Sequence, residues 1–490
     1  MNRKSLFGVV LVAMLALTGS VAGWAQSSPL SFVPASAQIT VYLPAVESFE
    51  TEAAPLLALP AVKEKMDINA LLGELPGKLG VADATSLSAV FKAAGLDATK
   101  PLAVYLRKNE TGAMEVSGAL PVADEAVATE KMKNVFSEAP AEVAVGEAKG
   151  LFSATQKLGY FIQSGYVLMG STEPLLNELS ARLKEPAATK YAASNAPSEL
   201  AVITSFSNLQ AAGIIPTGPA TLNMEPTYQY FKSFIDEVAL GIGVQDGEAY
   251  VRLAMHDPAG AVAPPASQLQ LNNLIAGSSP LTLNLRNTPG FMDKVRTLFA
   301  GNPAMAKNLT YVMLASSMLG DELAVSVDGV NNNIPGGIVA AKLMKPESVK
   351  GLLGLAGVKG DPKYVHNGGS VYALENVKEG LNVYIATAGA LLLVSTNEDR
   401  LKKALDGLAA DGTIAAKSEL DPALLAKGAN GFIVLDGAKI DPAQVPMLPA
   451  GVNLADKKVV ATLGVNGEWR ELRIAVPGGL KSFNDVTSLM

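Results

Sequence analysis

The sequence predicts an α+β fold of two tandem homologous repeats, each a curved, mostly antiparallel sheet with helices packed on it. A stretch that runs from Tyr160 to Thr172 recurs without a gap from Tyr384, at an offset of 224, with five identical positions. Further matches occur in the same order at an offset of 221. Most strands are expected as hairpins, which pair antiparallel, and helices fall between them instead of alternating strictly with strands.

The stretch from Met1 to Ala25 has the character of an export signal. Arg3 and Lys4 precede an apolar run, Leu6 to Leu17, that is too short to span a bilayer comfortably. We expect cleavage after Ala25, because small residues precede it, and the chain has no cysteine for lipoprotein processing. The alternative is an uncleaved amino-terminal anchor. The signal predicts a periplasmic or secreted protein, and its form suits a bacterium.

The first repeat is expected over 26–256. It opens with a strand from Ile39 to Leu43, and short helices follow from about Glu47 to Ala94. The later elements alternate apolar strands with amphipathic helices. In order they are a hairpin at 102–106 and 114–122, a helix at 124–136, strands at 151–155 and 159–163, the repeated stretch, a helix at 173–184, a strand at 200–206, a short helix at 226–235 and a hairpin at 238–244 and 249–255.

A Pro/Ala-rich linker at 257–268 separates this repeat from a second one over 269–477, and 478–490 forms a tail. The second repeat follows the same order. Leu391 to Val394 is apolar at every position, which predicts a central strand covered on both faces. Whether the two repeats pack about a twofold axis or continue one sheet is left open. The expected elements are strands at 281–285 and 323–327, helices at 291–300, 304–319 and 346–356, strands at 371–374 and 383–386, a helix at 397–408, a strand at 432–435 and a hairpin at 459–465 and 469–476.

Composition excludes several classes of function. The net charge is −7, no basic patch of useful length exists, and nucleic acid is therefore not expected as a partner. Charged residues make up 17% of the chain and mean hydropathy is +0.25, which indicates full cores or an apolar surface. No stretch after the signal is expected to span a membrane.

No catalytic constellation, cofactor motif or metal motif is present. The two histidines, His256 and His366, are expected in the joint and in a turn, so neither is assigned to catalysis. The pairs Asp236-Glu237 and Asp321-Glu322 precede strands, where adjacent side chains point to opposite faces, so we expect solubilising charges. We expect no enzyme, no cofactor and no metal.

Two further features concern helices. Ser171-Thr172 and Ser395-Thr396 are expected to cap the helices that follow them.

The helices expected over 291–319 are rich in Met and other apolar residues, which suits adaptable apolar surfaces. Core packing is the plain interpretation, and the lining of an apolar-ligand pocket is the functional one. The candidate lining residues are Phe291, Met292, Val295, Phe299, Met305, Leu309 and Met313.

The stretch Leu319-Gly320-Asp321-Glu322-Leu323-Ala324-Val325 resembles the strand entrance of a group of exported bacterial proteins classed only as a domain of unknown function. That resemblance implies an exported α+β protein and assigns no catalytic residues. In architecture alone, the chain is similar to periplasmic lipid carriers with a half-barrel and covering helices. We expect a non-enzymatic envelope protein with a binding or scaffolding role. The alternatives are a carrier of a lipid, acyl chain or other apolar ligand, and a carboxylate-based hydrolase.

Overall fold

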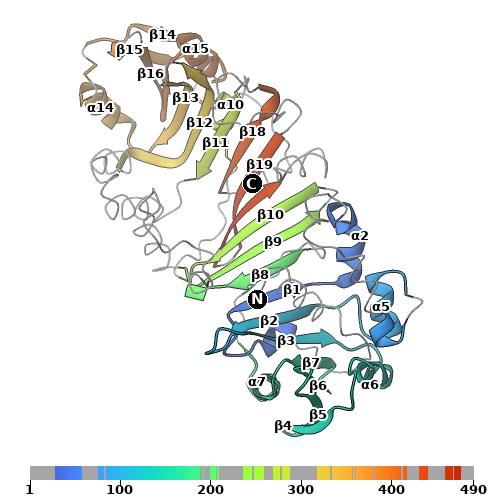
Figure 1. The fold of residues 1–490 in the computed structure, drawn as a ribbon. Coiled ribbons are helices and arrows are strands. Elements are labelled where there is room, and N and C mark those ends of the chain that lie inside the picture. Colours follow the sequence, from blue (N-terminus) through green and yellow to red (C-terminus); the bar gives the residue numbers. More distant parts are fainter. Residues whose placement is uncertain are drawn as a thin grey trace.

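The structure is a computed structural model in which twenty strands and seven α-helices are described (Figure 1). It describes residues 28–57, 76–81, 84–187, 191, 199–205, 207–208, 235–245, 248–258, 269–275, 279–286, 317–331, 334–355, 357–358, 360–378, 381–409, 412–415, 430–439, 458–466 and 468–475. The predicted signal, the tail and all but two residues of the predicted linker lie outside these residues, so those three assignments stay predictions.

The strands form one open sheet in which every pair is antiparallel, in the order β4-β5-β6-β7-β3-β2-β1-β8-β9-β10-β20-β19-β18-β11-β12-β13-β17-β16-β15-β14. Those before the predicted linker are β1 (Ile39–Leu43), β2 (Leu102–Lys108), β3 (Met114–Pro121), β4 (Ala141–Val145), β5 (Ala148–Ser153), β6 (Leu158–Gln163), β7 (Tyr166–Gly170), β8 (Leu200–Thr204), β9 (Glu237–Gln245) and β10 (Glu248–His256). Those after it are β11 (Leu281–Arg286), β12 (Leu319–Asn331), β13 (Ile334–Leu343), β14 (Tyr364–His366), β15 (Gly369–Lys378), β16 (Leu381–Ala388), β17 (Leu391–Ser395), β18 (Gly431–Asp436), β19 (Lys458–Asn466) and β20 (Trp469–Ala475).

The two groups of ten strands follow the same order from opposite ends of the sheet, and their pairing registers also match. Val104 of β2 pairs with Gly118, and Val325 of β12 pairs with Val339, so both members of the pair are related by an offset of 221. The groups meet where β10 pairs with β20, a junction that we call the seam. Figure 1 shows the green strands β9 and β10 beside the red strands near the carboxyl end. The sheet is therefore continuous across the whole molecule.

Helices cover both faces of the sheet in the first half. The helices α2 (Val46–Leu57), α5 (Leu87–Ala93) and α6 (Glu125–Lys133) cover one face, and the 3-10 turn η1 (Pro29–Phe32) and α7 (Glu173–Lys184) cover the other. Every residue of β7 is buried, because apolar side chains are needed on both of its faces. We call the face under α2 and α5 face A, and the face under α7 face B.

The second half is arranged in the same way. The helices α10 (Asn272–Ile275) and α15 (Glu398–Asp406) pack on face B, and α14 (Val349–Leu355) packs on face A, preceded by η2 (Pro346–Ser348). A third 3-10 turn, η3 (Gly437–Lys439), follows β18. The predicted double-sided covering of Leu391 to Val394 is confirmed, since Leu393 lies in the core under α15 and Leu392 and Val394 pack against the α14 cluster.

The N-cap prediction is confirmed at α7 and wrong at α15. Thr172 accepts a hydrogen bond from the Leu175 amide, but α15 is capped by Asn397, directly after Thr396, through the Arg400 amide. Thr396 instead accepts a hydrogen bond from the Gly337 amide on β13, as Ser171 does from Val116 on β3. An offset of 225 relates Ser171 to Thr396 and Thr172 to Asn397, so the ungapped offset of 224 was out of register by one position.

The turn before β7 explains the displacement. Ser164 and Gly165, between Gln163 and Tyr166, both have positive φ, as in a type I′ turn. In the second half Gly389 is the first residue of the two-residue turn and has positive φ, whereas Ala390 does not, as in a type II′ turn. Aligning the two glycines therefore shifted the rest of the repeated stretch by one position.

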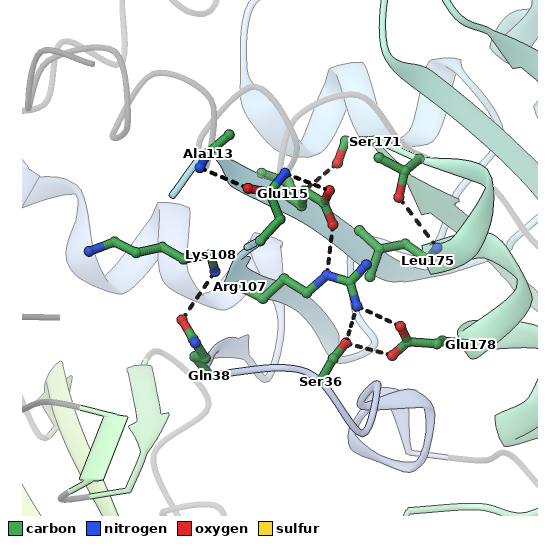
Figure 2. A network of polar contacts seen from close by, with 12 residues as sticks. Ser36, Gln38, Arg107, Lys108, Ala113, Glu115, Ser171, Leu175 and Glu178 are labelled. Atoms are coloured by element: carbon green, nitrogen blue, oxygen red, sulfur yellow. Dashed lines mark hydrogen bonds and ion pairs between the residues drawn. The ribbon is translucent and has the colours of Figure 1, made fainter. Parts of the chain in front are cut away.

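An ion-pair clasp fixes α7 on face B (Figure 2). Arg107 of β2 donates from Nη1 to Glu178 of α7 at 2.5 Å and to Ser36 before β1, and from Nε to Glu115 of β3 at 2.7 Å. Burial alone would lower the pKa of Arg107, but its bonds to Glu115 and Glu178 raise it above the usual value. Through one guanidinium the clasp connects two strands, the segment before β1 and a helix.

The second half has a clasp of opposite polarity. The cation there is Arg400 on α15, and the anion is Asp328 on β12, with 3.4 Å between Nε and Oδ2. Arg400 also donates to Ser279 before β11 at 2.6 Å. Asp328 corresponds to Arg107 at the offset of 221, so the strand charge is acidic in one half and basic in the other. Each half thus holds its helix to its sheet by a separate local ion pair.

Candidate functional site

The middle of the sheet consists of the strands β8-β9-β10-β20-β19-β18-β11-β12, and its face A is mostly apolar, with Arg470, opposite Met255 and Val465, as a charged exception. Cross-strand partners share a face, so the registers determine which side chains lie together. Leu240 on β9 is opposite Leu253 on β10, which is opposite Leu472 on β20, followed by Leu463 on β19. We call this surface the central apolar face. Its residues are Leu200, Val202, Val238, Leu240, Ile242, Val251, Leu253, Met255, Leu472, Ile474, Ala461, Leu463, Val465, Ile433, Leu435, Leu281, Leu283, Leu285, Leu323, Val325 and Val327.

Much of the central apolar face is accessible to solvent. Leu240 is 45% exposed and Ile242 is 38% exposed, although both belong to a strand inside the sheet. The three leucines of β11 on this face are half-buried, whereas the polar and charged side chains on its other face are buried. Contiguous exposed apolar surfaces of this kind mark sites that bind ligands, proteins or membranes.

Face B of the same strands buries polar and charged groups. Glu199, next to β8, is 1% exposed and accepts a two-pronged contact from Arg252 of β10, at 2.6 and 3.0 Å. Tyr191 and Tyr250 donate to the same carboxylate at 3.1 and 2.8 Å. Burial alone would lower the pKa of Arg252, but the hydrogen bonds to Glu199 raise it above its usual value. Burial raises the pKa of Tyr191, so the phenol stays protonated.

Glycines on β9 make room for this network. A Cβ atom on Gly241 would lie 2.5 Å from Cδ of Glu199, and one on Gly243 would lie 2.8 Å from the Tyr250 hydroxyl. The predicted hairpin at 238–255 is confirmed, but no pattern in it indicated that its inner face would cover a carboxylate. The small residues on one face of β9 are the sequence signal that could have indicated a side chain packed against this strand.

A second buried carboxylate lies in the other half. Glu322 of β12 is 1% exposed and accepts the amides of Gln270 and Leu271, at 2.6 and 2.7 Å, and pairs with Lys342 at 2.9 Å. Its neighbour Asp321 is 54% exposed. Both acids lie near Lys342, at 3.9 Å from Asp321 and 2.9 Å from Glu322, where β12 has a register shift, so the two carboxylates are not held apart on opposite faces. Glu322 is also not a solubilising charge, because it holds the 270–271 backbone against the sheet.

The seam carries its own polar contacts. His256, expected in the joint, is the last residue of β10 and is buried against Trp469, with ring centroids 5.2 Å apart. Its Nδ1 lies 2.6 Å from Asp236 and its Nε2 lies 2.8 Å from Glu468, which belongs to the other half. The predicted position in a joint is wrong because β10 extends to pair His256 with Trp469. Asp236 thus orients a histidine and is not simply a solubilising charge.

A cavity of about 250 Å³ opens beside Asp236 on the first half. It lies between the start of β1, the end of β8 and the start of β9. Its described lining residues are Leu30, Val33, Ala37, Gln38, Thr40, Ala187, Tyr191, Ile203, Thr204, Ser205, Asn208, Asp236 and Glu237. Tyr191 connects the cavity to the Glu199 network, and Asp236 connects it to His256.

The apolar-ligand residues predicted at 291–313 lie outside the described residues, so that prediction is neither placed nor tested. Among the residues that are described, no group of three acidic, histidine or cysteine side chains could hold a metal ion. Within the same part of the chain, no helix has the length and hydropathy needed to cross a membrane.

Comparison with known proteins gives a weak structural likeness only. No protein-family model matches the sequence, and no curated protein does. Two crystal forms of TP0453 are similar to the chain, with 12% identity and a TM-score of 0.28. They cover 47% and 49% of this chain and 81% and 84% of that protein. A score this low carries no argument about function, and the resemblance to the exported group stays a prediction.

Proposed function

We propose that this is an exported, non-enzymatic envelope protein that binds an elongated apolar ligand, such as a lipid or acyl chain, along the central apolar face. One observation carries the proposal: aliphatic side chains on this face run across the seam from β8 to β12, with Leu240 and Ile242 exposed. Export to the periplasm rests on the predicted signal. The ligand can be a lipid or another aliphatic molecule, because the surface offers contact area and little hydrogen bonding.

The contrast between the two faces supports this proposal. In an ordinary antiparallel sheet with one solvated face, apolar side chains point to the core and polar ones to water. Here Arg252 and Glu322 point to the covered side, and Leu240 points to the accessible side. Burying charges is costly even when they are paired, so this pattern favours a sheet whose apolar face is kept for binding.

We also propose that the chain arose by internal duplication. Both halves use the same strand order, matching registers and a helix clasp built on the same strand position, Arg107 in one half and Asp328 in the other. The offset between equivalent strands is 242 from β1 to β11, and it is 221 both from β2 to β12 and from β10 to β20. Duplication supports the binding proposal, because it doubles the length of one apolar surface without requiring a new fold.

The proposal contains no chemical step. Clustered buried carboxylates would favour the hydrolase alternative, but Glu199 and Glu322 lie in different halves and each is paired with a cation. The buried Asp257 likewise pairs with Arg470 at 2.9 Å. These carboxylates support structural roles and leave binding as the favoured function.

Native and denaturing mass spectrometry of the protein, purified from a bacterial periplasm, tests the proposal together with extraction of any released lipid. We expect a stoichiometric aliphatic species and saturable binding of a dansyl-labelled undecanoic acid. The double variant L240D/I242D should weaken probe binding at least tenfold, because it places two charges on the apolar surface.

The matched control is Val365→Asp, since Val365 is 65% exposed on β14, away from the central strands. It should leave probe binding unchanged. A protein that carries no lipid and does not bind the probe would contradict the ligand proposal, and an equal effect of both variants would show that binding is nonspecific.

A further inference from the structure

We propose that the strand β4, at one end of the sheet, is a self-association edge, to which a second copy of this chain adds its own β4 in antiparallel orientation. Within the described part of the chain, β4 pairs with β5 alone, so its other edge has no strand beside it. The strands β5, β6, β7, β3, β2 and β1 lie between β4 and β8, where the central apolar face begins. The two surfaces are therefore separate.

The outer edge of β4 offers the backbone groups of Glu142 and Ala144. Gly146 opens the two-residue turn to β5, and its φ of 62° is typical of the first position of a type II′ turn. Such a turn makes Val145 and Ala148 a hydrogen-bonded pair, and successive residues then direct their N–H and C=O groups to opposite sides of the strand. Glu142 and Ala144 therefore each direct a donor and an acceptor away from β5.

This edge lacks the usual protection against pairing. Natural sheets protect their edges with lysines, prolines, bulges or very short strands. The strand at the other end of the sheet, β14, has only three residues. In contrast, β4 has five residues, its pairing with β5 shows no register shift, and its sequence, Ala-Glu-Val-Ala-Val, contains no lysine and no proline. An added strand therefore fits β4 better than β14.

The sequence of β4 is complementary to itself in one register. A twofold pairing centred on Val143 places Glu142 opposite Ala144 of the second copy, so that every outward N–H meets a C=O. A pairing centred on Glu142 would place two glutamates opposite each other, which is destabilising. A pairing centred on Ala144 would bring Glu142 against the turn at Gly146 of the second copy. Only the first register uses both outward residues without opposing like charges.

Charge and packing favour the same register. Lys149 is the cross-strand partner of Ala144 and contacts Glu142 of its own chain at 2.6 Å. In the dimer, Glu142 of the second copy lies in the same row, just beyond Ala144, so opposite charges are complementary across the new edge. On face B, Val143 and Leu183 pack against the core under α7 but are only half-buried, and the second copy covers apolar surface there. Two short strands bury little area, so the dimer is weak and reversible.

Disulfide crosslinking tests the register, because the chain has no cysteine. Residues opposite each other in a non-hydrogen-bonded pair have Cα atoms about 4.5 Å apart, which a disulfide can span. Oxidation of Val143→Cys with copper phenanthroline should therefore give a covalent dimer. The matched control is Ala141→Cys on the same strand, whose two copies lie about 13 Å apart along the strands and should not crosslink. No dimer from Val143→Cys, or equal crosslinking of both variants, would contradict the proposal.

Sedimentation equilibrium of the cysteine-free protein measures the association itself. Ala144→Pro removes one outward N–H from each copy and leaves the pairing with β5 intact, so the dimer should weaken about tenfold or more. Val365→Pro makes the same change on the outer side of β14 and should have no effect. Circular dichroism shows whether each variant is folded. If Ala144→Pro is not, Ala144→Glu replaces it, because it opposes Glu142 of the second copy with a like charge. A protein that stays monomeric at every concentration, or that associates equally well in the folded edge variant, would overturn the proposal.

Discussion

Arg252 and Arg473 lie directly opposite each other across the seam, on β10 and β20. Their positions differ by 221, which is also the offset between the first residues of β10 and β20. Arg252 contacts Glu471 at 2.8 Å, and Arg473 lies 3.8 Å from the ring centroid of Tyr250, the position equivalent to Glu471 at the same offset. One of these two opposed arginines makes an ion pair and the other makes a cation–π contact.

Removing the Arg252 charge should destabilise the protein strongly. Arg252→Met leaves Glu199 buried without its cation, which costs about 3–5 kcal/mol in the free energy of unfolding. Urea denaturation measures this loss. The control Lys92→Met removes an exposed pair with Glu47 and should cost about 0–1 kcal/mol. Equal costs for the two variants would mean that Glu199 is solvated.

Gly241→Ala should destabilise the same network, because the added Cβ meets Cδ of Glu199 at 2.5 Å and that carboxylate is held by Arg252. Overpacking of this kind costs about 1–3 kcal/mol. Gly351→Ala is the control, since it lies in α14 with open space around it and should stabilise by up to about 1 kcal/mol. A neutral Gly241→Ala would show that β9 can move away from Glu199.

The helix caps give a local test of the corrected register. Asn397→Ala and Thr172→Ala should each cost about 1 kcal/mol, because each removes the acceptor for an amide in the first turn. Asn397→Ser should restore most of the loss in α15. Thermal unfolding of the three variants and of Thr396→Ala measures the effect. If Thr396→Ala lowered the stability by about 1 kcal/mol and Asn397→Ala did not lower it, Thr396 would be the N-cap, as the sequence predicts.

Alkaline pH should destabilise the first half. Burial raises the pKa of Tyr160 to about 12 from its usual value of 10, and it raises the pKa of Tyr105 as well. The unfolded chain therefore releases these protons first, and the contribution of Tyr160 is present below pH 10 and is lost between about pH 10 and 12. Denaturant titrations at pH 9 and 11.5 measure the loss.

Tyr160→Phe isolates one contribution to that loss. Its hydroxyl is buried without a hydrogen-bond partner among the described residues, so the variant should differ from the parent by about 1 kcal/mol or less at pH 7. At pH 11.5 the variant should be more stable than the parent. An identical loss in both proteins would mean that Tyr160 ionises equally in the folded and unfolded chains.

The alternation of strands and the helix patterns predicted most of the elements described. The hairpin of β2 and β3 and the helices α6 and α7 lie close to their expected positions, because local periodicity and turn chemistry determine them. The strands β4 and β14 were missed. The Ala141–Val145 strand has mostly exposed side chains, and the Tyr364–His366 strand is very short, so neither shows an apolar pattern.

The candidate sites could not be predicted in the same way. Glu199 and Arg252 are separated by 53 positions, and His256 and Glu468 by 212, so only the strand order brings them together. Local sequence patterns also do not indicate which face of the central strands is covered by other parts of the protein. The ungapped match between the two stretches misplaced a cap by one position, because turns of two types put their glycine at different places.

The seam has a consequence for how the chain is made. The strand β10 ends at His256 and its partner β20 begins only at Trp469, after nearly all of the second half, so synthesis completes the first half long before that partner exists. During that interval β10 is an unpaired edge, which invites pairing with other chains. The charge of Arg252 on that strand, held by Glu199, is the kind of feature that discourages such pairing until β20 arrives.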